Sequence, residues 1–254
     1  MARPVAIVTG SSAGIGAATA LKFAGNGFNV VINYSRDPKP AEEVAEACRK
    51  AGAEVEAFKA DVSDDSACRA MAAAVENRWG RVRALVNNAG RTKFVAHKNL
   101  DGLSAEDFQS IYAVNVIGAF QMARAFAPLL RKEQGAAIVN VSSIAAVMAR
   151  GSSIAYMASK GALNTLTMAL ARALGPEIRV NGVGPGMIES DWLKNGYGAE
   201  NYEAMGRMYR DVSVLASTIA PGDVADTIFA LCTAFPKTTG ETVLIDAGFR
   251  LQKA

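Results

Sequence analysis

The chain is poor in the side chains that bind metal ions or assist hydrolysis. Its 254 residues include one histidine, His97, and three cysteines, Cys48, Cys68 and Cys232, which lie far apart with no CxxC pair. A zinc site normally takes several of these ligands, and a Ser-His-Asp hydrolase would have to use His97. His97 stands in a polar stretch and is expected to be a solvated loop residue. We predict no metal site, and three unpaired cysteines favour a reducing, cytoplasmic compartment.

A strong charge excess and long apolar runs are also missing. The 27 basic and 24 acidic residues are scattered and leave a net charge of +3, so no basic patch predicts nucleic-acid binding. The apolar runs are far shorter than the roughly 20 residues that a membrane helix needs. The first run, residues 5–8, leads directly into a glycine-rich stretch, which favours a strand over a signal peptide. We expect neither nucleic acid nor membrane as a partner.

Half of the residues are hydrophobic, and short apolar runs alternate with longer helical patterns along the whole chain. Strands that are apolar without alternation are buried on both faces, as in parallel sheets covered by helices. This pattern predicts an α/β protein with a single Rossmann-type domain over residues 1–254, in which helices cover both faces of a doubly wound, seven-stranded parallel sheet. The predicted strands are 5–10, 29–34, 54–61, 84–90, 136–143, 178–186 and 241–248. The predicted helices are about 14–26, 40–51, 64–79, 104–117 and 119–132, with another beginning near Ser153.

Residues 187–220 form the least regular region. Their glycines and aromatic side chains indicate a segment that covers a substrate beside the site. An ordinary long surface insertion is the alternative.

The stretch TGSSAGIG, residues 9–16, falls where the first strand turns into the first helix. Glycines allow backbone N–H groups to approach a diphosphate, and the helix N-terminus presents unpaired amides and a positive dipole end. The spacing is G-x-x-x-G-x-G rather than the commoner G-x-G-x-x-G, so a merely tight turn is the alternative. The residues predicted to bind a nucleotide here are Gly10, Ser12, Gly14, Ile15 and Gly16.

The end of the second strand indicates which nucleotide binds. An acid at this position usually holds a free ribose 2′-hydroxyl, but here the chain reads Asn33-Tyr34-Ser35-Arg36. Asn33, Ser35 and Arg36 are suited to a 2′-phosphate, with a charge-assisted contact from Arg36. We therefore favour NADP(H) over NAD(H); the alternative for Arg36 is a solvated loop charge.

At this point the sequence resembles the classical short-chain dehydrogenases/reductases, including members that act as 3-oxoacyl-[acyl-carrier-protein] reductases. Several motifs occur in the family's order over essentially the whole chain. They are TGSSAGIG at 9–16, DV at 61–62, NNAG at 87–90, the asparagine of YAVNVIG at 115, VSS at 141–143, YMASK at 156–160 and GPGMI at 184–188.

The resemblance implies a role for each motif. Asp61 and Val62 would border the adenine, and Asn88, Ala89 and Gly90 would line the cofactor. Pro185, Gly186 and Ile188 would lie at the nicotinamide carboxamide. The catalytic tetrad would be Asn115, Ser143, Tyr156 and Lys160, with Tyr156 and Lys160 also touching the cofactor. The resemblance further implies a homo-oligomer, a tetramer or dimer, built in part on the helix that continues after Lys160.

Three positions depart from the family pattern. Ala13 stands where NADP-dependent members often carry a basic residue, which weakens the preference for NADP(H). Ser190 replaces the usual threonine and keeps the hydroxyl. The C-terminal IDAG, residues 245–248, varies the more frequent VDGG. None of the three touches the implied chemistry.

The four-residue spacing of Tyr156 and Lys160 places them on one face of a helix. A free tyrosine has a pKa near 10 and is a poor base at neutral pH, but a neighbouring cation favours the phenolate. Lowering the pKa to roughly 7 requires about 4 kcal/mol, which the ammonium and an oxidised nicotinamide together are expected to supply. Ser143 would orient the substrate oxygen, and Asn115 would hold a water that relays protons from Lys160.

These features predict an oxidoreductase that interconverts a carbonyl and a secondary alcohol. A non-catalytic nucleotide sensor on the same fold is one alternative, and a serine hydrolase with a Ser143–Lys160 pair is another. The substrate is left open between 3-oxoacyl thioesters, sugars, polyols, steroids and polyketide ketones. The predicted pocket residues are Met148, Arg150, Met187, Trp192, Tyr197 and Tyr202.

Overall fold

A computed structural model describes residues 3–253, which form a seven-stranded, wholly parallel sheet in the order β3-β2-β1-β4-β5-β6-β7. The strands are β1 (Val5–Val8), β2 (Asn29–Tyr34), β3 (Val55–Lys59), β4 (Ala84–Asn87), β5 (Ala137–Val141), β6 (Arg179–Pro185) and β7 (Thr242–Ile245). The strand order reverses between β1 and β4, and ligands of such sheets bind outside the carboxyl ends of the strands at that point. The predicted fold class is confirmed.

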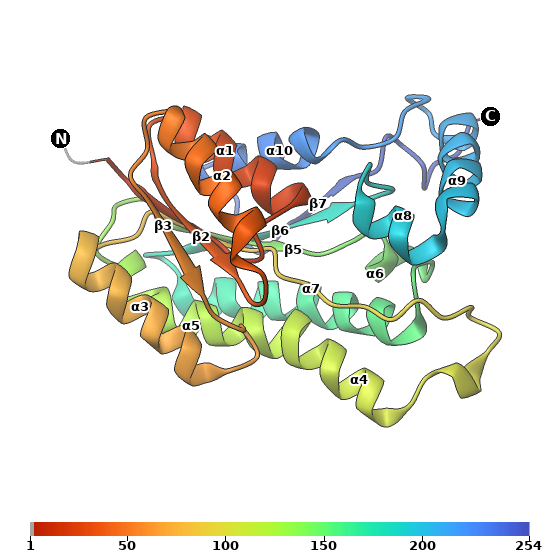
Figure 1. The fold of residues 1–254 in the computed structure, drawn as a ribbon, viewed down its shortest axis with the longest axis horizontal. Helices are drawn as coiled ribbons and strands as arrows, with labels where there is room; N and C mark the ends of the chain where they lie inside the picture. Colours follow the sequence, from red (N-terminus) through yellow and green to blue (C-terminus); the bar gives the residue numbers. More distant parts are fainter. Residues whose placement is uncertain (1–2, 254) are drawn as a thin grey trace.

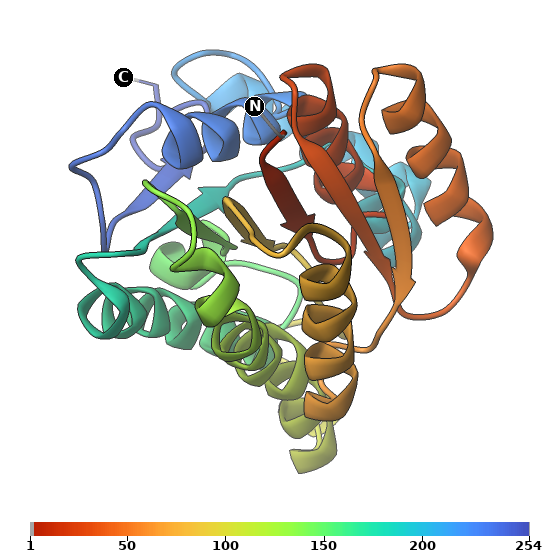
Figure 2. The same cartoon turned by 90° about the vertical axis from the view of Figure 1, so that its left-hand side faces the viewer.

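Helices cover both faces of the sheet (Figures 1 and 2). One hydrophobic cluster contains residues of α1 (Gly14–Gly25), α2 (Pro38–Lys50) and α10 (Pro221–Thr233). The other contains residues of α3 (Asp65–Trp79), α5 (Ala119–Leu130) and α7 (Ile154–Leu174). Buried, unalternating strands such as β1 supply apolar side chains to both clusters, as expected of a sheet between two helical layers.

Each of the predicted strands is found, but several are shorter than predicted. The strand predicted over 54–61 covers 55–59, and that predicted over 241–248 covers 242–245. The residues that follow these strands turn into the loops at the carboxyl edge, where the nucleotide motifs lie.

The helices predicted over 104–117 and 119–132 form one continuous helical run. Helix α4 (Ala105–Tyr112) passes through a π-helical stretch, Ala113–Gly118, directly into α5. By length and composition the run Ala105–Leu130 would suffice to cross a membrane, but 56% of its apolar window is buried in the protein. This burial identifies it as a core helix.

Residues 187–220 are more regular than predicted. They contain α8 (Asp191–Tyr197) and α9 (Ala199–Val212), and the ends of the segment meet in a bridge between Ile188 and Ile219. Tyr209 fixes α9 to the end of the sheet, since its hydroxyl donates to the Asp246 carbonyl at 2.8 Å. Two further elements complete the described chain: the 3₁₀ turn Leu100–Gly102 and the short α6 (Ala145–Met148). Helices α8, α9 and α10 lie outside the predicted helices.

Candidate active site

A cavity of about 1380 Å³ opens at the carboxyl ends of the strands, between the sheet and α8–α9. It brings together most of the site residues predicted from the sequence. Those that line it are Gly10, Gly14, Ile15, Asn33, Ser35, Arg36, Asp61, Val62, Asn88, Ala89, Gly90, Ser143, Tyr156, Lys160, Pro185, Gly186 and Ile188. Ser12, Gly16 and Asn115 are not among the lining residues.

The glycine turn is shaped by close backbone packing. Gly10 has φ +58°, and a Cβ on it would lie 2.9 Å from Ala89 Cα. A Cβ on Gly16 would lie 2.5 Å from Asn88 Nδ2. That amide donates to the carbonyls of Thr9, at 2.8 Å, and Gly10, at 3.0 Å. Gly16 therefore acts by letting the helix approach the NNAG stretch, which explains why it lies behind the cavity wall.

The start of helix α1 is open toward the cavity. Gly14 has φ +55°, and a Cβ built on it would meet nothing within 4 Å. The N-cap residue, Ala13, offers no side chain to cap the first amides. A helix N-terminus of this kind presents unpaired N–H groups and the positive end of the dipole. The residues present therefore fit a diphosphate.

The three residues predicted to hold a 2′-phosphate differ in their surroundings. The Asn33 side chain is engaged within the protein: Oδ1 accepts from Gly10 N–H at 3.1 Å, and Nδ2 donates to the Ala60 carbonyl at 3.0 Å. It ties the glycine turn to the sheet. Ser35 and Arg36 are exposed on the cavity wall. The nearest carboxylate in sequence, Asp37, caps helix α2 by accepting from Lys39 N–H at 3.0 Å.

Tyr156 and Lys160 lie in the first turns of α7, which begins after its N-cap, Ser153. The Ser153 hydroxyl accepts from Tyr156 N–H at 3.3 Å. Lys160 Nζ lies 5.6 Å from the centre of the Tyr156 ring and donates to the Val141 carbonyl at 2.7 Å. The one-turn spacing thus places both groups on the face that meets the end of β5.

In the chain without cofactor, the pKa of Tyr156 is raised and not lowered. The expected lowering included the charge of an oxidised nicotinamide, so it stays a prediction for the cofactor-bound protein. Burial raises the pKa of Tyr156 to about 12, and the hydrogen bond with Ser143 only partly opposes that effect. Burial lowers the pKa of Lys160 to about 8. Both groups are desolvated, and desolvation disfavours the charged form of each. At neutral pH the chain holds a protonated phenol, which is the form that gives a proton to a carbonyl oxygen.

Ser143 and Asn115 complete the predicted tetrad in different ways. Ser143 lies on the cavity wall, where its hydroxyl accepts from Ala145 N–H at 3.1 Å. Asn115 is buried in the π-helical stretch, and its Nδ2 donates to Ser159 Oγ at 2.9 Å. Its Oδ1 accepts from Arg91 N–H at 2.7 Å. Asn115 therefore fixes the chain that follows the NNAG stretch instead of entering the cavity.

The serine–lysine pair of a hydrolase is not formed in the described part of the chain. Ser159 Oγ donates to the Tyr156 carbonyl at 2.7 Å, and the Lys160 ammonium is directed to Val141. Ser143 bonds to Ala145 and Tyr156. Neither serine is activated by the lysine.

The substrate side of the cavity differs from the prediction at two positions. Arg150, Met187, Trp192 and Tyr197 line it, whereas Met148 and Tyr202 pack into a small hydrophobic cluster around Tyr209 and Phe249. Both lie on helices whose other faces point to the cavity, and sequence spacing alone did not separate those faces.

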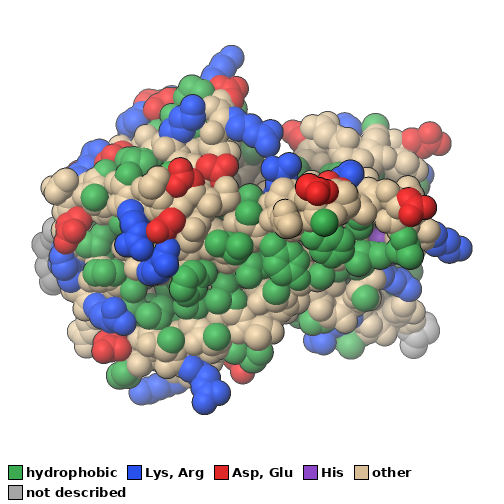
Figure 3. All heavy atoms as spheres, turned by 90° about the horizontal axis from the view of Figure 1, so that it is seen from below, with side chains coloured by type: hydrophobic (Ala, Val, Ile, Leu, Met, Phe, Trp, Pro, Cys, Tyr) green, Lys and Arg blue, Asp and Glu red, His purple; other side chains and the backbone are tan. Residues whose placement is uncertain are grey.

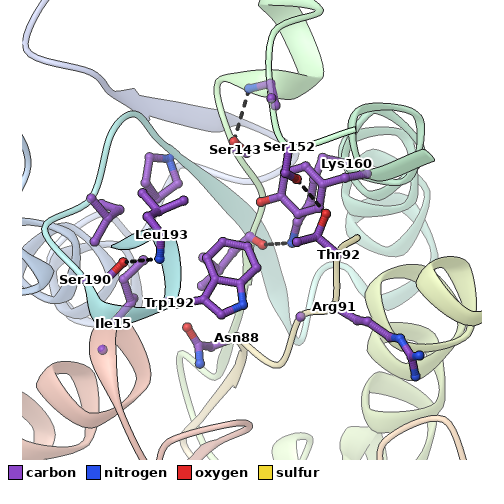
Figure 4. A pocket seen from close by; sticks show the side chains of 18 of the residues that line it. Ile15, Asn88, Arg91, Thr92, Ser143, Ser152, Lys160, Ser190, Trp192 and Leu193 are labelled. Atoms are coloured by element: carbon purple, nitrogen blue, oxygen red, sulfur yellow. Dashed lines mark hydrogen bonds between the residues drawn. The ribbon is translucent and has the colours of Figure 1, made fainter. Parts of the chain in front are cut away.

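The loop after β4 supplies residues that sequence reasoning missed. Thr92 and Ser152 share a hydrogen bond of 2.5 Å, and His97 Nε2 lies 2.7 Å from the Gly151 carbonyl. His97 is exposed, as predicted for a solvated residue, yet it also lines the cavity. These contacts join the loop to the segment preceding α7, and Figure 4 shows Thr92 and Ser152 side by side above Arg91. Their only sequence signal is their position between the NNAG and YMASK motifs.

Comparison with known proteins agrees with this geometry. The sequence profile of the short chain dehydrogenase family matches residues 4–200. A relative from Streptomyces violaceoruber, named as ketoacyl reductase 2 of the granaticin polyketide synthase, is 38% identical over 98% of this chain and 96% of its own length. The chain belongs to the short-chain dehydrogenase family.

Solved structures agree in fold and length. A short-chain dehydrogenase/reductase from Burkholderia xenovorans superposes with a TM-score of 0.92 at 40% identity, covering 99% of both chains. An NAD⁺-bound xylitol dehydrogenase superposes with a TM-score of 0.87 at 26% identity, covering 96% of this chain and 98% of that one. The protein is an oxidoreductase of a family that binds a nicotinamide cofactor and acts on small molecules. These enzymatic relatives give no support to the non-catalytic sensor.

Proposed function

We propose that the protein interconverts a carbonyl compound and a secondary alcohol with NADP(H), using Tyr156 as the general acid and base. The observation that carries the proposal is the convergence of Tyr156, Lys160 and Ser143 on a cavity that also contains an open helix N-terminus. The cofactor, when bound, supplies or accepts the hydride. The glycine turn would hold its diphosphate, Lys160 its nicotinamide ribose, and the backbone at Ile188 its carboxamide.

Tyr156 would transfer the proton, while Ser143 and Lys160 assist it. In reduction, the Tyr156 phenol gives its proton to the carbonyl oxygen, and Ser143 donates a hydrogen bond to the same oxygen. In oxidation, Tyr156 must first ionise, which its raised pKa disfavours in the chain alone. The Lys160 ammonium, held by Val141, stabilises the phenolate by its charge. Asn115 would hold the water that returns protons to solvent, and only its backbone is left for this role, because Arg91 and Ser159 engage its side-chain amide.

The test is the absorbance of the nicotinamide band while purified protein acts on a panel of ketones and alcohols. Tyr156→Phe removes only the hydroxyl and should lower turnover by about 10²-fold or more, the usual contribution of a positioned acid or base. Unchanged turnover in this variant would end the proposal. Tight cofactor binding without turnover of any compound would favour the sensor instead.

The preference for NADP(H) rests on Ser35 and Arg36, which line the cavity, and on Asp37, the next carboxylate in sequence, which is engaged as the cap of helix α2. Arg36→Ala should raise the KM for NADPH about tenfold and leave the KM for NADH nearly unchanged, since a charge-assisted hydrogen bond contributes roughly 1.5 kcal/mol or more. The matched control is Lys39→Ala, at the exposed second residue of α2. Equal effects on both cofactors would contradict this assignment.

We further propose that the protein is a homo-oligomer, either a dimer or a tetramer, and that it works in the cytoplasm. We also propose that residues 187–220 cover the substrate. Three large apolar side chains are exposed on the α5–α7 side: Ile117 (50%), Phe120 (41%) and Met168 (51%). Figure 3 shows a band of hydrophobic side chains across this side of the molecule. A second copy would cover such a band. All three cysteines are unpaired and buried, which suits a reducing compartment.

A further inference from the structure

Trp192 stands out among the residues of the cavity because it is large, apolar and poorly covered. Its side chain lines the cavity, and 47% of the residue is exposed. Figure 4 shows the indole projecting into the cavity from the start of α8, above Asn88. Leaving an aromatic side chain in water forfeits the large gain of burying it. An indole in this position therefore has an unused apolar face next to the proposed reacting centre.

Aromatic neighbours hold the indole in place from behind. The Phe94 ring meets Trp192 edge-on, with centroids 5.7 Å apart, and meets Tyr197 in the same way at 4.8 Å. Gly196 makes this packing possible, because a Cβ there would lie 2.0 Å from the Phe94 ring. Edge-to-face pairs at these separations are favourable. Trp192 is thus a supported surface and not a freely rotating side chain.

The indole faces the proposed acid. Its ring centre lies 6.3 Å from that of Tyr156, and the two planes are inclined by 53°, so that the rings form a wedge. The indole N–H of Trp192 has no acceptor among the described residues, whereas that of the other tryptophan, Trp79, donates to Glu54 Oε2 at 3.2 Å. The Trp192 indole therefore combines an apolar face with an N–H donor that no described residue engages.

The cavity also contains flexible apolar side chains. Met187, Met205 and Met208 are among its lining residues, and thioethers adapt to flat, irregular ligands and make favourable contacts with aromatic rings. No carboxylate side chain is paired with the indole donor in the described chain.

We infer that Trp192 is a specificity-determining residue, which selects carbonyl compounds whose reacting group adjoins a flat aromatic or conjugated ring. The ring of the substrate lies on the indole face, and its carbonyl oxygen points to Tyr156. This inference rests on the proposed function for the reaction, but it adds the class of substrate.

The test compares 1-tetralone with its saturated counterpart, 1-decalone. For each enzyme, the ratio of kcat/KM for the two ketones is measured, and the change in that ratio between variants cancels their different intrinsic reactivities. Trp192→Leu should lower the ratio about fivefold to tenfold, mainly through the KM for 1-tetralone, as expected for the loss of one stacking contact. Trp192→Phe should retain most of the preference, and Trp79→Leu should leave it unchanged.

A second readout does not depend on turnover. The chain has two tryptophans, so Trp79→Phe leaves Trp192 as the sole indole reporter. Its fluorescence should be quenched by 1-tetralone at concentrations at least fivefold lower than by 1-decalone. Such quenching without turnover would refute the proposed reaction and keep the inference. An unchanged ratio in Trp192→Leu, or equal quenching by both ketones, would overturn the inference even if the protein reduces ketones.

Discussion

Replacing Lys160 by methionine should stabilise the free protein at neutral pH while abolishing its chemistry. Lys160 is 3% exposed, and its ammonium has the Val141 carbonyl as acceptor, at 2.7 Å, with no carboxylate within ion-pair distance in the described chain. Burial lowers its pKa from 10.5 to about 8. Keeping the group protonated in the folded state at pH 7 therefore costs about 3 kcal/mol.

The sign of the effect follows from proton uptake. Between about pH 8 and 10.5 the folded protein has lost the Lys160 proton and the unfolded chain has kept it. The Lys160 contribution to the free energy of unfolding therefore rises by about 1.4 kcal/mol per pH unit in this window. Methionine removes the cost of burying an ammonium and, with it, the dependence of stability on pH between about 8 and 10.5. It also takes away the hydrogen bond to the Val141 carbonyl, which costs about 1 kcal/mol of stability.

Lys160→Met should thus be more stable than the wild type by about 2 kcal/mol at pH 7. The advantage should fall to zero between about pH 9 and 10, and by about pH 10.5 the variant should be about 1 kcal/mol less stable than the wild type. Urea unfolding at equal protein concentrations, without cofactor, measures this difference. Burial also raises the pKa of Cys48, Cys68 and Cys232, but these groups titrate alike in both proteins, so they cancel. Lys39→Met, at an exposed position, is the control. A difference between Lys160→Met and wild type that stays constant from pH 7 to 10 would refute the reasoning.

Three further predictions follow from the site and the surface. Spectroscopic titration of the free protein should detect no ionisation of Tyr156 below about pH 10, because its pKa is raised to about 12, and a Tyr156→Phe difference spectrum at lower pH would contradict this. Gly16→Ala should weaken cofactor binding at least tenfold, measured by calorimetry, because its Cβ would lie 2.5 Å from Asn88 Nδ2, whereas Gly161→Ala, with open space around it, should bind normally. Met168→Glu should reduce the oligomer to smaller species in sedimentation, since it puts a charge on the exposed apolar face; an unchanged mass would place the interface elsewhere.

Local patterns in the sequence were enough to predict the fold. The runs NVVINY and AAIVNV are apolar without alternation, and only a sheet covered on both faces buries every side chain of such a strand. The one-turn spacing of Tyr156 and Lys160 likewise follows from helix geometry, and both groups reach the cavity. The motifs that follow β1, β4 and β5 converge because parallel strands end at one edge.

Interactions between distant segments were not predictable in this way. Asn33 appeared suited to a phosphate, but the glycine turn and Ala60 engage its amide. The helical run 105–130 was divided at Gly118, although a π-helical stretch carries it through. The sequence predicted Trp192 only as one of six pocket residues. The structure shows that Phe94, from another loop, packs against the indole and fixes its orientation.

The order of residues along the chain therefore determined the strands, the helices, and the edge of the sheet at which the reactive groups gather, since each depends on neighbours within a few positions. Tertiary packing alone decided the ionisation of those groups. The sequence places a cation beside a phenol, which favours the phenolate, but burial removes water from both and raises the pKa of Tyr156. Desolvation depends on everything that surrounds a group, and that includes segments more than a hundred residues away.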